Sequence, residues 1–189
     1  MATACFTGHR QLNGQYYNRN NPSTEWVMLK NYLNTVLMGL MTQHNCIHTG
    51  PATQCNCVNH FISGLAIGVD MLAAECVAHT RTLVKTPIIL TGAMPFPSQP
   101  SKWPQHSQDH FQYICALCNE VVTVSPDPYH PSKMQIRNEW MVDRSNYVIA
   151  IWNGIEKGGT WNCISYTRSA GKPVLWIELN GTQWRNSWI

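Results

Sequence analysis

The sequence is poor in charge and contains no long apolar run. Asp, Glu, Lys and Arg make up 12% of the 189 residues, about half of the ~25% usual in soluble domains. The net charge of +3 is too small to indicate a nucleic-acid-binding protein on electrostatic grounds. No stretch of about 18 apolar residues exists, so the sequence predicts no membrane-spanning helix. The first ten residues show no basic stretch followed by an apolar segment, so we expect no secretory signal and a cytoplasmic protein.

The remaining composition is that of one folded domain covering residues 1–189. Hydrophobic residues make up 44% of the chain and eight residues are Trp, which excludes a disordered composition. Eight cysteines are present, but the length of the chain and the missing signal favour reduced thiols over a disulfide framework. No internal repeat or low-complexity tract interrupts the chain.

Short apolar runs alternate with helical patterns along the chain, which predicts an α/β fold with a mostly parallel sheet and helices on both faces. Strands are expected at 3–7, 58–63, 87–91, 120–125, 147–152 and 173–179, the last strand of the chain. Helices are expected at about 26–40, from 69 onward, around 111–118, and at 131–145 and 160–170. The Pro-rich stretch 95–104 is expected to hold no regular structure.

Ligands of such sheets bind beyond the carboxyl ends of the strands, and three glycine-containing loops follow predicted strands. The first contains Gly8, His9 and Arg10. Glycine lets the backbone approach a ligand, and an arginine can pair with phosphate through two hydrogen bonds. The alternative is a tight turn that carries a solvated arginine.

The second loop joins a predicted strand to a predicted helix and contains Ser63, Gly64, Gly68 and Asp70. Backbone N–H groups at such a helix start can hold an anion. The spacing matches neither the dinucleotide-binding fingerprint nor a P-loop. Asp70 has the simpler alternative role of capping the helix.

The third loop, with Gly158, Gly159 and Thr160, again places small residues and a hydroxyl at the start of a predicted helix. One such loop is weak evidence for a binding site. Because the carboxyl ends of parallel strands share one edge of the sheet, three of them predict a shared crevice.

A helical stretch adds a fourth set of residues. Met134, Arg137, Asn138 and Met141 share one helix face by their spacing. An arginine among methionines needs a partner, because a desolvated cation is costly. A ligand phosphate and an internal carboxylate are the two alternatives.

Aromatic residues near the crevice are candidates for stacking a base. Trp103, Trp152 and Trp161 lie near it by their position in the chain, and Asp70 or Asn162 suits a ribose. Stacking of a base on an aromatic ring contributes ~1–3 kcal/mol. Packing in the core or in a lid is the alternative for each tryptophan.

Several segments together resemble the SLOG superfamily, and within it the YpsA/YoqJ-like branch. They read FTGHR, FISGLAIGVDMLAAE, MQIRNEWMVDRSNYVIAIWNG and GGTWNCISYTRSAGKPV. The resemblance covers nearly the whole chain. It implies a single Rossmann-like domain whose loops bind nucleotide-related ligands.

Lonely-guy-type phosphoribohydrolases are relatives within this resemblance. Arg137 matches the arginine of their Arg-Lys pair, and Asn138 stands where the lysine would be. Gly159 and Thr160 match the end of their glycine loop, whereas Cys163 occupies the position of their acid/base glutamate. A thiol does not replace a carboxylate in proton transfer, so the catalytic residues stay unassigned while the phosphate-binding parts are kept.

The leading hypothesis is therefore binding of a nucleotide-derived small molecule, an ADP-ribose or NAD-related signal, without a separate cofactor. A phage-borne copy would sequester such a signal without cleaving it. The first alternative is a hydrolase of N-glycosidic bonds. The second is single-stranded DNA binding, because SGLAIGVD is similar to the glycine motif of DprA/Smf proteins, although the low charge argues against nucleic acid. Related folds often form dimers, so we expect a homo-oligomer.

Histidines and cysteines crowd the segment before the second predicted strand. They are His44, Cys46, His48, Cys55, Cys57 and His60. These residue types bind zinc, but the spacing of the cysteines is not that of a zinc finger. We predict an irregular insertion without metal. Cys115 and Cys118 lie on an apolar helix stripe and are predicted to be buried structural thiols.

Overall fold

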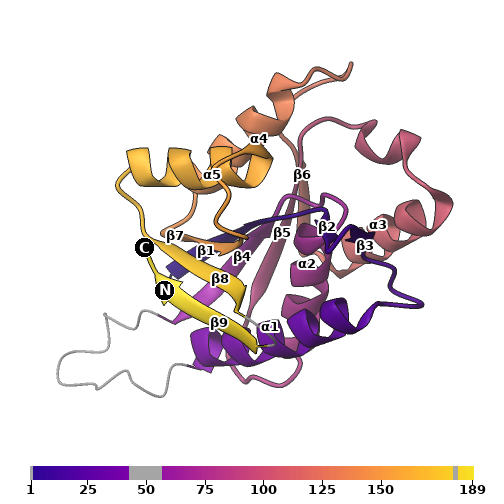
Figure 1. Ribbon diagram of the computed structural model, residues 1–189. Coiled ribbons are helices and arrows are strands. Elements are labelled where there is room, and N and C mark those ends of the chain that lie inside the picture. The colour runs from indigo at the N-terminus through magenta and orange to yellow at the C-terminus, as the bar shows by residue number, and fades with distance from the viewer. Residues whose placement is uncertain (1, 43–56, 181–182) are drawn as a thin grey trace.

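A seven-stranded sheet forms the centre of the protein in the computed structural model, which describes residues 2–42, 57–180 and 183–189 (Figure 1). The strands are β1 (Ala2–Gly8), β4 (Val58–Ser63), β5 (Ile89–Met94), β6 (Glu120–Thr123), β7 (Tyr147–Ile151), β8 (Val174–Asn180) and β9 (Gln183–Trp188). Their spatial order is β6-β5-β4-β1-β7-β8-β9, and every neighbouring pair is parallel except β8 with β9. The predicted α/β class with a mostly parallel sheet is confirmed.

Helices cover both faces of the sheet. The elements α1 (Thr24–Thr42), α2 (Val69–Thr80) and α3 (Gln105–Leu117) lie on one face, and α4 (Ser132–Asp143) and α5 (Gly158–Ser169) lie on the other (Figure 1). In α1 the side chains of Leu29, Leu33 and Leu37 repeat every four residues and are fully buried against the sheet.

The central strands are apolar because both of their faces are covered. All five residues of β7 are buried, and their side chains alternate between two hydrophobic cores. Ile149 and Ile151 pack with α1 and α2, whereas Val148 and Ala150 pack with α4 and α5. This arrangement leaves the carboxyl ends of β1 and β7 side by side at one edge of the fold.

Two elements were missed by the sequence patterns. The polar segment after β1 contains a small hairpin of β2 (Gln11–Leu12) and β3 (Gln15–Tyr16). Its turn is Asn13–Gly14, and both residues have positive φ, 48° and 77°, as hairpin turns of two residues require. The strand predicted at 173–179 is present as β8, but the prediction that it is the last strand is wrong, because β9 follows it and pairs with it.

The Pro-rich stretch also differs from the prediction. Gln99–Lys102 form a short 3-10 helix. Pro100 lies at its start, where the missing backbone N–H costs no hydrogen bond. The expectation of no regular structure in this stretch is therefore wrong.

The cysteines divide into two groups. Cys5, Cys76, Cys115, Cys118 and Cys163 are free thiols. Cys57 is in a disulfide, so the expectation of fully reduced thiols is wrong at that position.

The histidine- and cysteine-rich segment lies mostly outside the described residues, which include only two of its six candidates. One of these, His60, has Nε2 2.9 Å from Thr91 Oγ1. Among residues 2–42, 57–180 and 183–189, no three His, Cys, Asp or Glu side chains form a group that could hold a metal ion. The same described residues include no helix both long and apolar enough to span a bilayer.

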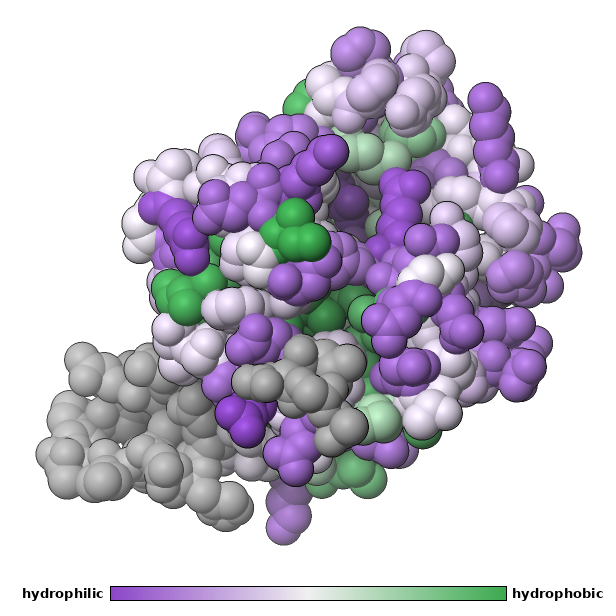
Figure 2. Space-filling view, in the orientation of Figure 1, coloured by the Kyte–Doolittle hydropathy of each residue, from purple (hydrophilic) through white to green (hydrophobic). Residues whose placement is uncertain are grey.

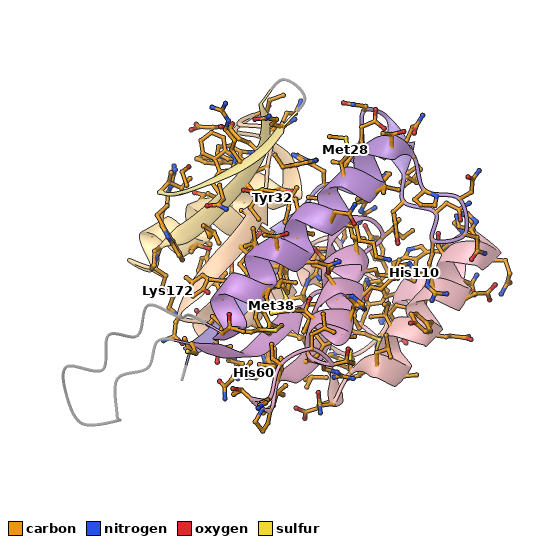
Figure 3. All side chains as sticks on the ribbon, turned by 90° about the horizontal axis from the view of Figure 1, so that it is seen from below. Met28, Tyr32, Met38, His60, His110 and Lys172 are labelled. Carbon is orange, nitrogen blue, oxygen red and sulfur yellow. The ribbon has the colours of Figure 1, made fainter. Side chains whose placement is uncertain are left out.

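A buried carboxylate joins the three helices of the larger core. Lys30 Nζ donates to Glu75 Oε1 at 2.9 Å, and Arg19 Nε lies 3.5 Å from the same oxygen. The Tyr17 hydroxyl donates to Oε2 at 3.2 Å, and His110 Nε2 is also 3.2 Å from Oε2. His110 lies on the side of α3 that faces the other two helices (Figure 3). The cluster therefore ties α1 and α3 to α2.

Acid should weaken this cluster. Burial raises the pKa of the Glu75 carboxyl, but hydrogen bonds from His110 and Lys30 and their charges outweigh burial and lower it from 4.5 to about 2. A carboxyl with a lowered pKa stabilises the fold above its unfolded pKa, and this contribution is lost as the pH falls from 4.5 towards 2.

We therefore expect Glu75→Gln to lower the stability at neutral pH. We also expect the stability of this variant to fall less steeply than that of the wild type as the pH is lowered. Urea unfolding at a series of pH values measures both effects. Glu120→Gln, at an exposed site on β6, is the control and should keep the wild-type profile. A variant at position 75 that loses stability as steeply as the wild type below pH 4.5 would contradict this role.

Candidate functional site

A cavity of about 310 Å³ lies where β1 ends. We call it the arginine cavity. Its walls are Thr7, Gly8, His9, Arg10, Ala66, Asp70, Met134, Arg137, Asn138, Gly159 and Thr160. They come from the end of β1 and the loop after it, from the loop before α2 and the first turn of α2, from α4 and from the start of α5, so the segments predicted to converge do so. A hollow with a mostly hydrophilic rim is visible near the centre of Figure 2.

A buried ion pair forms the floor of the arginine cavity. Arg137 Nη1 donates to Asp70 Oδ2 at 3.2 Å, and the two residues are only 5% and 6% exposed. Of the two partners considered for Arg137, the structure shows the internal carboxylate. Burial raises the pKa of the Asp70 carboxyl, and the charge of Arg137 opposes that rise. Arg137 Nε is buried without a hydrogen-bond partner in the described chain.

Ser63 and Gly64 contact the two residues of the ion pair but do not line the cavity. A Cβ at Gly64 would overlap the guanidinium of Arg137 and lie 2.6 Å from Asp70 Oδ2. The Ser63 hydroxyl donates to the Asp70 carbonyl oxygen at 2.8 Å and accepts from the Leu65 amide at 3.2 Å. Glycine at 64 is required because the guanidinium occupies the space of a side chain.

At the start of α2, two of the first three amides are already engaged, contrary to the expectation of an open anion site there. The Val69 amide donates to the His9 carbonyl at 3.1 Å, and the Met71 amide donates to Ala66 at 3.3 Å. Gly68 has a φ of 98°, and a Cβ there would lie 2.6 Å from the Arg10 Cα. This loop therefore holds the segment after β1 in place.

The start of α5 is the open helix end of the site. Lys157 precedes the helix without making a side-chain cap, and Gly158 has a φ of 83°. Gly159 and Thr160 line the cavity, and a Cβ at Gly159 would meet no atom within 4 Å. The first amides of a helix have no partner within the helix, and the helix dipole favours negative charge there. With the exposed Arg10 opposite, this side of the cavity suits an anion.

Gly68 and Gly158 do not line the arginine cavity, and three predicted side chains lie elsewhere in the fold. Trp103 packs edge-on against Phe111, with ring centroids 5.7 Å apart. Trp152 is buried, and one of its faces stacks on Trp161 at 5.4 Å. Asn162 lies on α5 in a shallow depression between α4 and α5. Conversely, Thr7 and Ala66 line the cavity although they were not predicted as site residues, and so does Met134, which was predicted only to share a helix face with Arg137.

The thiol that replaces the expected glutamate is not an acid/base group. Cys163 is fully buried. Burial raises the pKa of its thiol to about 11, although a hydrogen bond with Thr7 works in the opposite direction. The thiol is therefore protonated at neutral pH. The carboxyl of Glu75 does not take over the acid/base role of the missing glutamate, because it is engaged in the cluster between α1, α2 and α3.

Comparison with known proteins assigns the sequence to a family. Residues 4–168 match the model of the YspA SLOG family, so the chain is a member of that family. It is 29% identical over 126 residues to the uncharacterised SPbeta prophage-derived protein YoqJ of Bacillus subtilis, a match covering 57% of this chain and 68% of the relative.

Two solved structures of DNA processing protein A (DprA) are similar in fold. The chain from Streptococcus pneumoniae superposes with a TM-score of 0.63 at 14% identity, and the chain from Helicobacter pylori with 0.58 at 18% identity. Both matches cover 96% of this chain. They cover 52% of the first DprA chain and 67% of the second, so this chain spans about half of the first protein.

Proposed function

We propose that the protein binds a phosphate-bearing, nucleotide-derived small molecule in the arginine cavity, of the ADP-ribose or NAD-related class. Membership of the SLOG family supports a nucleotide- or DNA-related role. The observation that carries the proposal is the convergence of Arg10 with the uncapped start of α5 on one cavity. A guanidinium and helix-start amides are the donors that phosphate groups accept.

Binding without cleavage is the form of this activity that the site supports best. The thiol of Cys163 replaces the glutamate of the phosphoribohydrolases and is protonated at neutral pH, since burial raises its pKa to about 11. The relative YoqJ is prophage-derived. A phage-borne copy of such a protein would remove a signalling nucleotide from a host defence by sequestering it.

Arg10→Ala should weaken binding of the phosphate group. A hydrogen bond to a charged group contributes ~1.5–3 kcal/mol, so we expect the dissociation constant for ADP-ribose to rise about 10- to 100-fold. Calorimetry on the folded protein measures this change. Arg10 is exposed and makes no ion pair within the described residues, so the fold should be unaffected.

Arg144→Ala is the matched control, because Arg144 lies at the far end of α4 and stacks on Trp140. It should bind ADP-ribose as the wild type does. An equal loss of affinity for ADP-ribose in the two variants would mean that the net positive charge of the protein, and not the cavity, attracts the ligand. No binding of AMP, ADP, ADP-ribose or NAD by the wild type would overturn the proposed function.

A second candidate function is hydrolysis of an N-glycosidic bond. The supporting observation is that a carboxyl with a raised pKa, Asp70, lines the arginine cavity, as is frequent for acid/base groups. Release of a free base from nucleoside monophosphates or NAD by the wild type, and its loss in Asp70→Asn, would support this function. Intact substrate after long incubation with saturating protein would reject it.

Single-stranded DNA binding is the third possibility, because the DprA of Helicobacter pylori, which is similar in fold, binds single-stranded DNA. A small net charge of +3 argues against it, since affinity for DNA comes largely from neutralised phosphates. Titration of a labelled oligonucleotide at low salt tests it, and a flat signal would remove it.

A further inference from the structure

A second cavity, of about 480 Å³, adjoins the arginine cavity. We call it the carboxylate cavity. Its walls are His9, Gln11, Leu12, Asn13, Gly14, Glu25, Ile151, Trp152, Asn153, Glu178 and Trp184. Only His9 lines both cavities. Its volume falls within the ~300–1,000 Å³ typical of small-molecule sites.

The elements that the sequence patterns missed build much of the carboxylate cavity. Asn13 and Gly14 form the turn between β2 and β3, and Trp184 lies on β9. Glu25 stands in the first turn of α1, and Glu178 near the end of β8. The hairpin, β9, α1 and β8 thus all contribute walls to this cavity.

The two cavities differ in charge. The arginine cavity contains Arg10 and Arg137, whereas the walls of the carboxylate cavity contain two glutamates and neither lysine nor arginine. Glu25 accepts a hydrogen bond from the Ser23 hydroxyl at 2.9 Å. The Glu178 carboxylate makes no ion pair within the ranges that the structure describes. Gln11, Asn13 and Asn153 add neutral side-chain amides, which can both donate and accept hydrogen bonds.

His9 is fixed at the boundary between the cavities. Its Nε2 accepts a hydrogen bond from the Asn153 amide at 3.3 Å, and burial lowers the pKa of its ring. The neutral ring therefore separates an anion-binding side from a side rich in hydrogen-bond acceptors. A molecule that fills both cavities must pass it.

We propose that the carboxylate cavity binds the hydroxyl-bearing sugar at the far end of the ligand, a terminal ribosyl group, while its phosphates occupy the arginine cavity. The inference rests on the proposed function and extends it. Carboxylates accept hydrogen bonds from ribose hydroxyls in nucleotide-binding proteins, and Trp184 offers an apolar surface beside them. A metal ion is not the occupant that the residues favour, because no group of three suitable ligands exists among the described residues.

The test compares ADP-ribose with ADP, which lacks the terminal ribose, on the wild type, Glu178→Gln and Arg10→Ala. We expect ADP-ribose to bind the wild type at least about 10-fold more tightly than ADP, as one good charged hydrogen bond would give. Glu178→Gln should lose most of this difference and keep its affinity for ADP. Arg10→Ala should weaken both ligands.

Glu120→Gln on β6 is the matched control for charge and should behave as the wild type. Hydrogen exchange gives a second readout: ADP-ribose should protect 11–16 and 183–186 from exchange, and ADP should not. Equal affinities for ADP and ADP-ribose, or an unchanged preference in Glu178→Gln, would overturn the ribosyl site and leave the proposed function standing. If the wild type binds neither ADP nor ADP-ribose, both the ribosyl site and the proposed function are overturned.

Discussion

Arg137→Ala is expected to destabilise the protein by about 3–5 kcal/mol, the cost of removing one partner from a buried ion pair. Asp70, 6% exposed, would then hold a carboxylate away from water with its main cationic partner gone. Chemical denaturation at neutral pH measures the loss. Because burial already raises the pKa of Asp70, protonation should relieve the charge, and the deficit should shrink in acid.

The double variant Asp70→Asn/Arg137→Gln separates this effect from loss of packing. If the buried charge dominates, the neutral pair should recover about 0.5–3 kcal/mol relative to Arg137→Gln alone, which keeps the same side chain at position 137, a coupling usual for residues in contact. Arg144→Ala, exposed at the end of the same helix, should cost less than about 1 kcal/mol. If the stability losses of Asp70→Asn and Arg137→Gln simply add in the double variant, the buried ion pair is not the cause of the loss.

Gly68→Ala is the second variant with a large expected effect, a loss of about 3 kcal/mol or more. Two costs combine, and each is ~1–3 kcal/mol: a non-glycine residue at positive φ and a side chain forced into filled space. The φ of Gly68 is 98°, and the new Cβ would lie 2.6 Å from the His9 carbonyl oxygen and from the Arg10 Cα. Backbone atoms cannot move aside as a flexible side chain can.

Gly39→Ala is the control for this substitution. Gly39 is exposed within α1, and a Cβ there meets no atom within 4 Å. Alanine should stabilise the helix by roughly 0.5–1 kcal/mol. Thermal and urea unfolding should therefore show a lower stability than the wild type for Gly68→Ala and a higher stability for Gly39→Ala. A mild effect at Gly68 would show that the loop after β1 is free to shift.

The sequence predicts well what depends on local apolar patterns. The observed bounds of β4, Val58–Ser63, are those expected. Its apolar residues Val58, Phe61 and Ile62 are buried, and Gly64 follows the strand directly. β9 was missed because Gln183–Trp188 is almost wholly exposed, so no buried face marks the strand. The hairpin β2–β3 was missed although Asn13–Gly14 is the dipeptide most typical of such turns.

The candidate site was predictable as a set of loops but not as a set of contacts. Parallel strands bring their carboxyl ends to one edge, so the meeting of Arg10, Arg137 and Gly159 follows from the topology. The partner of Arg137 is 67 positions away in the chain, and no local pattern distinguishes Asp70 from a ligand phosphate. Trp152 was expected to end its strand but directly follows β7, which ends at Ile151. Its ring contacts Trp161 and Trp176 and lines the carboxylate cavity instead of the arginine cavity.

The antiparallel β9 also determines which side chains lie at the outer edge of the sheet. β8 is apolar and largely buried, and an uncovered strand of that kind invites edge-to-edge aggregation. β9 occupies that edge and presents instead a polar ribbon that includes Arg185 and Asn186. Charged and polar side chains on an outermost strand discourage further strand addition. The polar side chains of β9 thus disfavour pairing of this edge with another strand.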